Sequence, residues 1–201
     1  MSPATAPQFN DVREKILATG QRIMGAKGFS AVGLNEILSE ASVPKGSFYH
    51  YFGSKEAFGE AMLESYFEDY LADIAATFRE PGLKMSQRLI NYFESWHNNQ
   101  SFLDCQGKCL AVKLGAEVAD LSESMRTALQ RGTAEIIRRL ADAIEAGVSD
   151  GSVTVDQEPR VVAQSLYQLW LGASIMAKIV RNTGPFEQAM TTTRQTLHLS
   201  P

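Results

Sequence analysis

The sequence predicts an all-α fold of about nine helices, and three observations carry this prediction. Apolar residues recur at helical spacing through most of the 201 residues. Clusters of Gly, Pro, Asn and Ser interrupt this spacing where helix ends are expected. No stretch alternates apolar and polar residues over the length of a strand, since the β-prone tetrad at 152–155 lies between two expected helices.

The first expected helix covers about 9–27. Asp11 precedes an apolar series with a helical period, and Lys27 and Gly28 supply a basic last turn and a residue suited to a left-handed stop. The residues up to Pro7 are rich in Pro and Ala and are expected to form a loose arm.

Three further helix starts follow within twenty-odd residues. Gly33 precedes a short helix that is expected to end near Glu40, and Pro44 is expected to occupy the first position of a helix through Tyr51. Ser54 then caps a longer helix. Two short helices joined by a tight turn and braced by a longer helix form a helix-turn-helix.

The rest of the chain continues as helices. The helix that Ser54 caps is expected to run to the break at 81–82. The remaining helices are expected at 86–99, 106–119, 122–146, 158–181 and 185–197.

Composition excludes several classes of protein. With 44% hydrophobic and 21% charged residues the chain is expected to be globular. No apolar run reaches membrane-spanning length and the first ten residues lack the features of a secretion signal, so we expect a cytoplasmic protein without a membrane partner. Cys105 and Cys109 form no disulfide framework or metal-ligand pattern, so no metal or cofactor is expected.

Charge is distributed unevenly. The net charge is −4, but residues 1–58 carry +1 and the remainder carries −5. Residues 44–55 contain no acidic side chain while Lys45, His50 and Lys55 stand among tyrosines and a serine. This segment can face phosphate, and on charge alone a solvated surface explains it equally well.

Residues 28–58, GFSAVGLNEILSEASVPKGSFYHYFGSKEAF, resemble the DNA-binding signature of the TetR family of transcriptional regulators. The resemblance rests on Gly-Phe after the first helix, Val-Pro-Lys-Gly-Ser, the Phe-Tyr-His-Tyr-Phe run and Ser-Lys-Glu at the next helix start. It implies a helix-turn-helix DNA-binding domain in 1–54 and a helical effector-binding and dimerisation domain in 55–201. A homodimer on a palindromic operator in double-stranded DNA is then expected.

The third helix is expected to enter the major groove with its first residues against base edges. Lys45 and Ser47 can donate to bases or phosphates, and Gly46 permits close backbone approach. Phe48 and Phe52 are expected to pack inward. The expected DNA contacts are Gly33, Lys45, Gly46, Ser47, Tyr49, His50, Tyr51 and Lys55.

One of these positions departs from the family pattern. The family usually has Thr where this chain has Gly33. Glycine still caps a helix adequately, but the side-chain contact to phosphate is lost and only a backbone amide remains for it.

Residues 107–126 and 166–179 resemble the N-ethylmaleimide-responsive (NemR-like) repressors, which sense reactive electrophiles. This implies that Cys109 is a sensing thiol. Nearby Lys113 and the start of a helix favour a thiolate, whereas inert buried packing is the alternative. Cys105 is a secondary candidate, and Lys178, set among apolar residues, is a candidate for tuning the thiol or a plain surface lysine.

The effector pocket and the dimer interface are expected in the C-terminal half. Candidates for the pocket are Tyr92, Trp96 and Trp170, each of which core packing explains as well. The resemblance implies a dimer bundle from the last two helices, with simple intramolecular core as the alternative; its residues would be Leu166, Leu169, Trp170, Ala173, Ala177, Phe186, Met190 and Leu197. Glu117 and Asp120 are assigned no function beyond pairing with Arg126.

The leading interpretation is a dimeric repressor, not an enzyme, that releases its operator when an electrophile or oxidant modifies a cysteine thiol. The alternatives are a regulator with a non-covalent small-molecule effector, a cysteine-dependent all-α enzyme and a non-specific architectural DNA binder. The enzyme would leave the helix-turn-helix unexplained, and the acidic C-terminal part disfavours the architectural protein.

Overall fold

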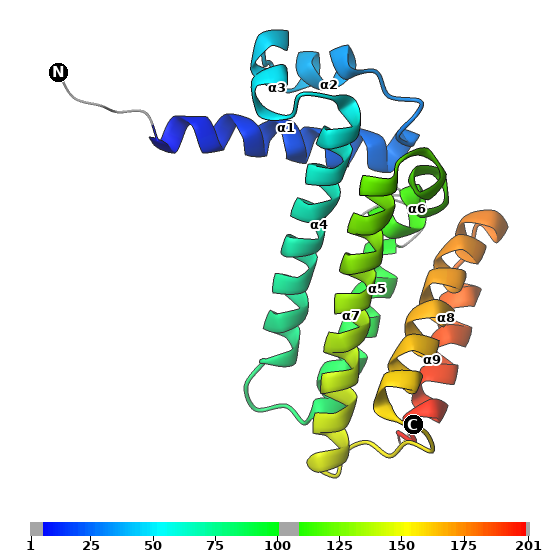
Figure 1. The fold of residues 1–201 in the computed structure, drawn as a ribbon. Helices are drawn as coiled ribbons and strands as arrows, with labels where there is room; N and C mark the ends of the chain where they lie inside the picture. The colour runs from blue at the N-terminus through cyan, green and yellow to red at the C-terminus, as the bar shows by residue number, and fades with distance from the viewer. Residues whose placement is uncertain (1–5, 101–108, 200–201) are drawn as a thin grey trace. The chain divides into compact units, whose positions relative to one another are not determined.

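The computed structural model describes residues 6–199 apart from 101–108, and these residues form helices without a strand (Figure 1). The all-α prediction is therefore confirmed. The helices are α1 Ala6–Lys27, α2 Leu34–Glu40, α3 Lys45–Tyr51, α4 Lys55–Phe78, α5 Met85–Gln100, α6 Leu110–Leu121, α7 Glu123–Ser149, α8 Pro159–Val180 and α9 Gly184–Thr196.

Pro44 and Cys109, both expected inside helices, lie just before them. Pro44 is the N-cap of α3 and not its first helical residue. Cys109, expected inside a helix from residue 106, has extended backbone angles and is the N-cap of α6. By contrast, the expected cap at Ser54 is confirmed, since its Oγ accepts a hydrogen bond from the Ala57 N–H at 3.1 Å.

The described residues form two compact units. The head unit comprises 6–68 and 109–131, and the bundle unit comprises 69–100 and 132–199. Helices α4 and α7 each contribute their first part to the head unit and the remainder to the bundle unit. The domain boundary expected after residue 54 stays a prediction.

The head unit packs α1, α2 and α3 around aromatic rings. Phe48 of α3 and Phe58 of α4 are fully buried, with ring centroids 5.4 Å apart. A Cβ at Gly20 of α1 would lie 2.3 Å from Cζ of Phe58, so only glycine allows α1 to approach this closely. The aromatic core of the head therefore fixes the direction in which α3 presents its outer face.

The turn between α2 and α3 is tight and carries local strain. The Val43 N–H donates to the Leu38 carbonyl at 2.9 Å, and Ser42 adopts a left-handed conformation with φ of 53°. A short turn of this kind holds the two helices in the helix-turn-helix arrangement that the sequence predicts.

The bundle unit has an aromatic core in which the polar atoms are bonded. Trp170 of α8 stacks on Phe93 of α5 at 4.9 Å between centroids. The indole N–H of Trp170 donates to Thr193 Oγ1 at 2.9 Å, and α8 and α9 lie side by side (Figure 1). Burying an indole with its donor satisfied avoids the cost of an unpaired polar group.

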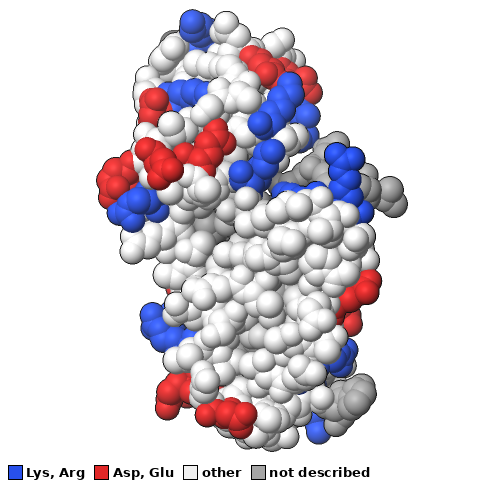
Figure 2. All heavy atoms as spheres, turned by 90° about the vertical axis from the view of Figure 1, so that its right-hand side faces the viewer, with Lys and Arg blue, Asp and Glu red and all other residues white. Residues whose placement is uncertain are grey.

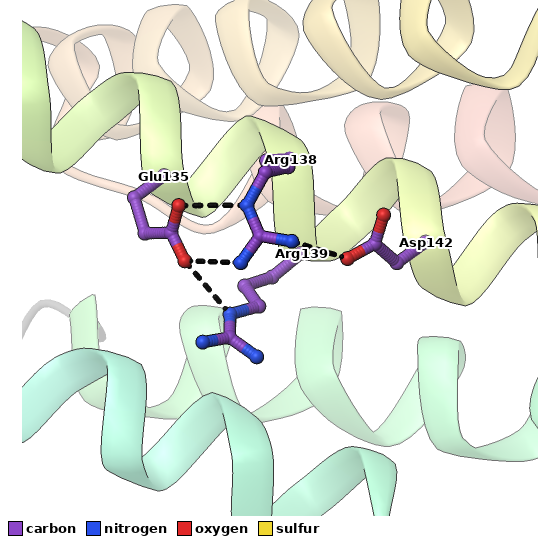
Figure 3. A network of polar contacts seen from close by, with 4 residues as sticks. All are labelled: Glu135, Arg138, Arg139 and Asp142. Carbon is purple, nitrogen blue, oxygen red and sulfur yellow. Dashed lines mark hydrogen bonds and ion pairs between the residues drawn. The ribbon is translucent and has the colours of Figure 1, made fainter.

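An ion-pair network runs along one side of α7 within the bundle unit (Figure 3). Arg138 donates to Glu135 and, at 2.9 Å, to Asp142, while Arg139 donates to Glu135 at 3.0 Å. The hydrogen bond from Arg138 holds the pKa of Glu135 below its ordinary value, and the charges of both arginines add to this against a smaller effect of burial. The paired side chains are three or four residues apart, a spacing at which ion pairs stabilise a helix.

Candidate DNA-binding and thiol-sensing sites

The residues of α3 that were expected to contact DNA lie on the side of the helix away from the aromatic core. Phe48 and Phe52 are buried, which confirms that they pack inward. Lys45, Gly46 and His50 are exposed, Ser47 and Tyr51 are half-buried, and Tyr49 is 51% exposed. The face opposite the aromatic core thus carries a cation, hydroxyls and an imidazole, the groups that contact phosphates and base edges.

The two glycines among the expected contacts have open space around them. A Cβ at Gly46 or Gly33 would meet no atom within 4 Å. Gly33 is the N-cap of α2, with φ of −80° and no side-chain cap hydrogen bond, so any residue type fits its backbone. The fold requires glycine at neither position, which leaves close approach to a ligand as a reason for Gly46.

Lys55 has partners within the head unit. Its Nζ donates to the Phe29 carbonyl at 2.9 Å and lies 4.6 Å from the centroid of the Phe29 ring. The ammonium therefore fixes the turn after α1. Its expected phosphate contact stays a prediction, which would use its remaining donors.

Cys109 lies at the start of α6 in the head unit. Its side chain is buried, with 8% exposed, and its carbonyl accepts a hydrogen bond from the Lys113 N–H at 3.1 Å. A helix N-terminus favours a thiolate. Cys105 and Lys108 lie outside the described residues.

Glu117, two turns further along α6, has partners that the sequence did not indicate. Its Oε2 accepts from the Phe29 N–H at 3.0 Å and its Oε1 accepts from the Ser30 N–H at 2.7 Å. Arg126, its expected partner, instead pairs with Glu123. The bond joins residues 88 positions apart, and no local pattern marks it, so only the folded chain reveals it.

The environment of Glu117 favours the carboxylate. Partial burial raises the pKa of Glu117, but hydrogen bonds from the Ser30 side chain and from the Ser30 and Phe29 N–H groups outweigh it. The charge of Lys113 acts in the same direction, and the resulting pKa is below the ordinary 4.5. Glu117 is therefore ionised and acts as an acceptor at neutral pH.

The pocket candidates lie in the core of the bundle unit. Tyr92, Trp96 and Trp170 are each at most 5% exposed, and the Trp96 indole donates to Ser174 Oγ at 3.0 Å. The structure gives them the core packing that was the alternative, and their role in a pocket stays a prediction. Lys178 is a half-buried residue of α8 in the same unit.

The expected dimer residues of α8 and α9 are mostly turned inward within one chain. Leu166, Trp170, Ala173, Ala177, Phe186 and Leu197 are all buried. The side of α8 that is open to solvent instead carries Val161, Ile175, Met176, Ile179 and Val180. Figure 2, viewed onto α8 and α9, shows a broad area without charged side chains on this face of the bundle unit. For the six buried residues, the alternative of simple intramolecular core therefore agrees with the structure.

Within residues 6–100 and 109–199, no group of three or more His, Cys, Asp or Glu side chains is arranged to hold a metal ion. In the same part of the chain, no helix combines the length and apolar character needed to cross a bilayer.

Two family models match the chain. The model described as "Bacterial regulatory proteins, tetR family" matches residues 16–62, and the model described as "Tetracyclin repressor-like, C-terminal domain" matches residues 86–193. These ranges contain the helix-turn-helix and most of α5 to α9, respectively.

Curated relatives match along nearly the whole chain. The HTH-type transcriptional repressor NemR of Escherichia coli K12 is 43% identical over 90% of this chain and 91% of its own length. The HTH-type transcriptional repressor DhaR of a Mycobacterium species is 34% identical over 90% of this chain and 89% of its own length.

One solved structure is similar to this chain in both fold and sequence. The crystal structure of reduced E. coli NemR matches with a TM-score of 0.88 and 43% identity, covering 93% of this chain and 97% of that chain. The resemblances to the TetR family and to NemR are both confirmed. The chain therefore belongs to the TetR family of bacterial regulatory proteins and is a helix-turn-helix transcriptional repressor, not an enzyme.

Proposed function

We propose that this repressor is a thiol switch, which binds a palindromic operator as a homodimer and releases it when an electrophile or oxidant modifies Cys109. The observation that carries the proposal is the position of Cys109. It is the N-cap of α6, and α6 belongs to the same compact unit as the helix-turn-helix and is hydrogen-bonded through Glu117 to the turn that precedes α2.

The chemistry needs no further protein group. The Cys109 thiolate adds to an activated alkene such as a maleimide, the new bond joins sulfur to carbon, and the neighbouring carbon takes a proton from solvent. Because the Cys109 side chain is buried, an adduct adds volume beside its packed neighbours at the start of α6. Its formation then favours a different arrangement of α6, and a typical coupling of this kind weakens binding at the second site about 10-fold to 100-fold.

Operator binding with and without N-ethylmaleimide tests the switch. Palindromic fragments from upstream of the protein's own gene are titrated by fluorescence anisotropy with wild type, Cys109→Ser and, as a matched control, Cys105→Ser. We expect the reagent to weaken binding about 10-fold to 100-fold in wild type and in Cys105→Ser but not in Cys109→Ser. Release from Cys109→Ser as well would assign the effect to another group, and no release from wild type would favour a non-covalent effector.

The DNA-binding face has its own test at Gly46. In Gly46→Ala the added methyl meets no atom of the chain, and alanine stabilises a helix by about 1 kcal/mol relative to glycine. We nevertheless expect operator affinity to fall at least about 10-fold, because the methyl occupies space needed by the DNA at the start of α3. Unchanged affinity would mean that this helix start does not approach the bases. Ala26→Gly, which changes an exposed position of α1, is the control for helix stability alone.

The open side of α8 supports the homodimer. Ile175 and Ile179 are 48% and 66% exposed and lie one helical turn apart beside Met176. Two copies of such an uncharged stripe can pack around a two-fold axis. We expect Ile179→Glu to be monomeric in sedimentation and to lose operator affinity, whereas Val148→Glu, an equal change at an exposed apolar position of α7, remains dimeric.

Lys178 is proposed as a group that tunes the thiol. Its half-buried position among apolar residues of α8 supports a role other than solvation. We expect Lys178→Met to slow the alkylation of Cys109, measured by mass spectrometry. An unchanged rate would leave Lys178 as a surface residue.

A further inference from the structure

We propose that the hydrogen bonds by which Glu117 of α6 holds the turn after α1, called the latch below, couple α6 to the helix-turn-helix. Modification of Cys109 then lowers operator affinity by weakening these hydrogen bonds. This inference rests on the proposed thiol switch, because it names the contact that carries the signal from Cys109. It predicts that the response to a thiol reagent depends on a residue that the reagent does not touch.

The latch is a set of converging hydrogen bonds. Both oxygens of Glu117 accept, one from the Phe29 N–H at 3.0 Å and the other from the Ser30 N–H at 2.7 Å, and the Ser30 hydroxyl donates to the same carboxylate. Two consecutive amides and a hydroxyl thus bind one ionised group. Hydrogen bonds to a charged acceptor are stronger than those between neutral groups, so this contact gives α6 a firm hold on the turn.

The chain is shaped to receive the carboxylate. Gly28 ends α1 with φ of +98°, and a Cβ at Gly28 would lie 3.1 Å from Oε2 of Glu117. Neither Phe29 nor Ser30 donates its N–H in a backbone hydrogen bond of the turn. The two amides therefore depend on Glu117, and without it they require water as a partner.

The same turn is held from the other side by α4. Lys55 donates to the Phe29 carbonyl, and a Cβ at Gly59 would lie 2.7 Å from Cε2 of Phe29, so the ring rests directly on α4. Phe29 is thus the point at which α4 and α6 meet the end of α1. Since α1 packs against both α2 and α3, a change in this turn reaches α3 through the packed helices of the head unit.

Cys109 and Glu117 are linked through the backbone of α6. Cys109, Lys113 and Glu117 follow at intervals of four residues, and the Lys113 N–H is bonded to the Cys109 carbonyl. The neighbouring side carries Leu110, Leu114 and Val118, all buried. A helix of this length moves as a body, so an adduct on the N-cap residue that displaces the start of α6 also displaces the carboxylate two turns further on.

Three variants distinguish the hydrogen bonds of Glu117 from a general effect of charge on α6. Glu117→Ala removes both acceptors, and Glu117→Gln keeps one acceptor and removes the charge. Asp120→Asn is the matched control, since it neutralises an exposed carboxylate of the same helix that does not accept from the Phe29 and Ser30 amides. For each full-length protein, operator affinity is measured with and without N-ethylmaleimide, and alkylation of Cys109 is followed by mass spectrometry.

We expect wild type and Asp120→Asn to lose about 10-fold to 100-fold in affinity on alkylation, whereas Glu117→Ala loses less than about 3-fold although Cys109 reacts to the same extent. Glu117→Gln should lie between them. Hydrogen exchange of the segment that contains Phe29 and Ser30 gives a second readout. Exchange in this segment should accelerate on alkylation in wild type and should already be fast in Glu117→Gln before the reagent is added.

Two results would overturn the latch, and each differs from a failure of the switch. Equal fold-losses in wild type and Glu117→Ala, with complete alkylation of both, would show that the signal bypasses Glu117 while the thiol switch stands. The signal would also bypass Glu117 if alkylated wild type released its operator while hydrogen exchange at residues 29–30 stayed unchanged. No release from alkylated wild type would instead refute the thiol switch on which the latch depends.

Discussion

Different contacts stabilise the inside of the head unit and the inside of the bundle unit. In the bundle unit, Trp170 and Trp96 are buried among other rings, and each indole donates to a hydroxyl within the same core. In the head unit, the turn after α1 is held by two charged side chains, Lys55 and Glu117, and by a glycine that allows contact with Phe29.

This difference indicates which unit can change state. A close-packed aromatic core has no second arrangement of similar free energy, because any shift opens cavities. A contact made of a few directional bonds at the edge of the protein can be exchanged for bonds to water at modest cost. The turn after α1 is therefore more easily switched than the aromatic core of the bundle unit.

The largest expected effect is in the bundle unit. Trp170→Ala should lower the free energy of unfolding by about 3–5 kcal/mol, because it opens a cavity and leaves Thr193 without its donor. Urea unfolding followed by circular dichroism measures this. Tyr49→Ala, which removes an exposed ring from α3, should change the same free energy by less than about 0.5 kcal/mol. Similar losses in both variants would mean that the aromatic core is not what stabilises this unit.

An intermediate effect is expected where the head unit depends on close approach. Gly59→Ala should cost about 1–3 kcal/mol, since its methyl would lie 2.4 Å from Met125 Sδ and 2.7 Å from the Phe29 ring. Gly115→Ala in α6, where a Cβ meets nothing within 4 Å, should instead stabilise the protein by up to about 1 kcal/mol. Thermal unfolding of the two variants tests the pair, and a neutral Gly59→Ala would contradict the tight packing of Phe29 on α4.

A smaller effect, about 1 kcal/mol, is expected from the charge of Glu117. Its pKa in the folded protein lies below the ordinary value of 4.5, so the unfolded chain binds its proton first as pH falls. Its stabilising contribution is therefore fully present above about pH 5 and is lost as pH falls through the lower folded pKa. The difference in unfolding free energy between wild type and Glu117→Gln, measured from pH 7 to pH 3, should shrink over that window. A difference that grows toward acid would refute the assignment.

The smallest effect is expected at the start of α2. Gly33→Ser should add a few tenths of a kcal/mol, because a serine oxygen at the N-cap accepts from an amide of the first turn that has no side-chain cap at present. Gly33→Ala, which offers no acceptor, is the control and should not stabilise. Operator affinity of the serine variant additionally tests whether a hydroxyl at this position contacts phosphate, as the family pattern implies.

Local signals in the sequence were sufficient for the helices and for the DNA-binding face. Gly28 ends α1, Ser54 caps α4, and Phe48 points inward, all as the sequence predicts. These features depend on side chains within a few positions of one another, so spacing and capping preferences determine them. The start of α6 was harder, because no capping residue marks Cys109 as the last residue before a helix.

Contacts between distant segments were decided only by the tertiary structure. The sequence by itself determined an all-α chain with a helix-turn-helix and a cysteine near a helix start. It did not determine that Glu117 binds Phe29 and Ser30 and not Arg126, or that Trp170 faces its own core and Ile179 faces solvent. A glutamate on a helix can bond to any donor within reach, and which donor comes within reach depends on how whole helices pack.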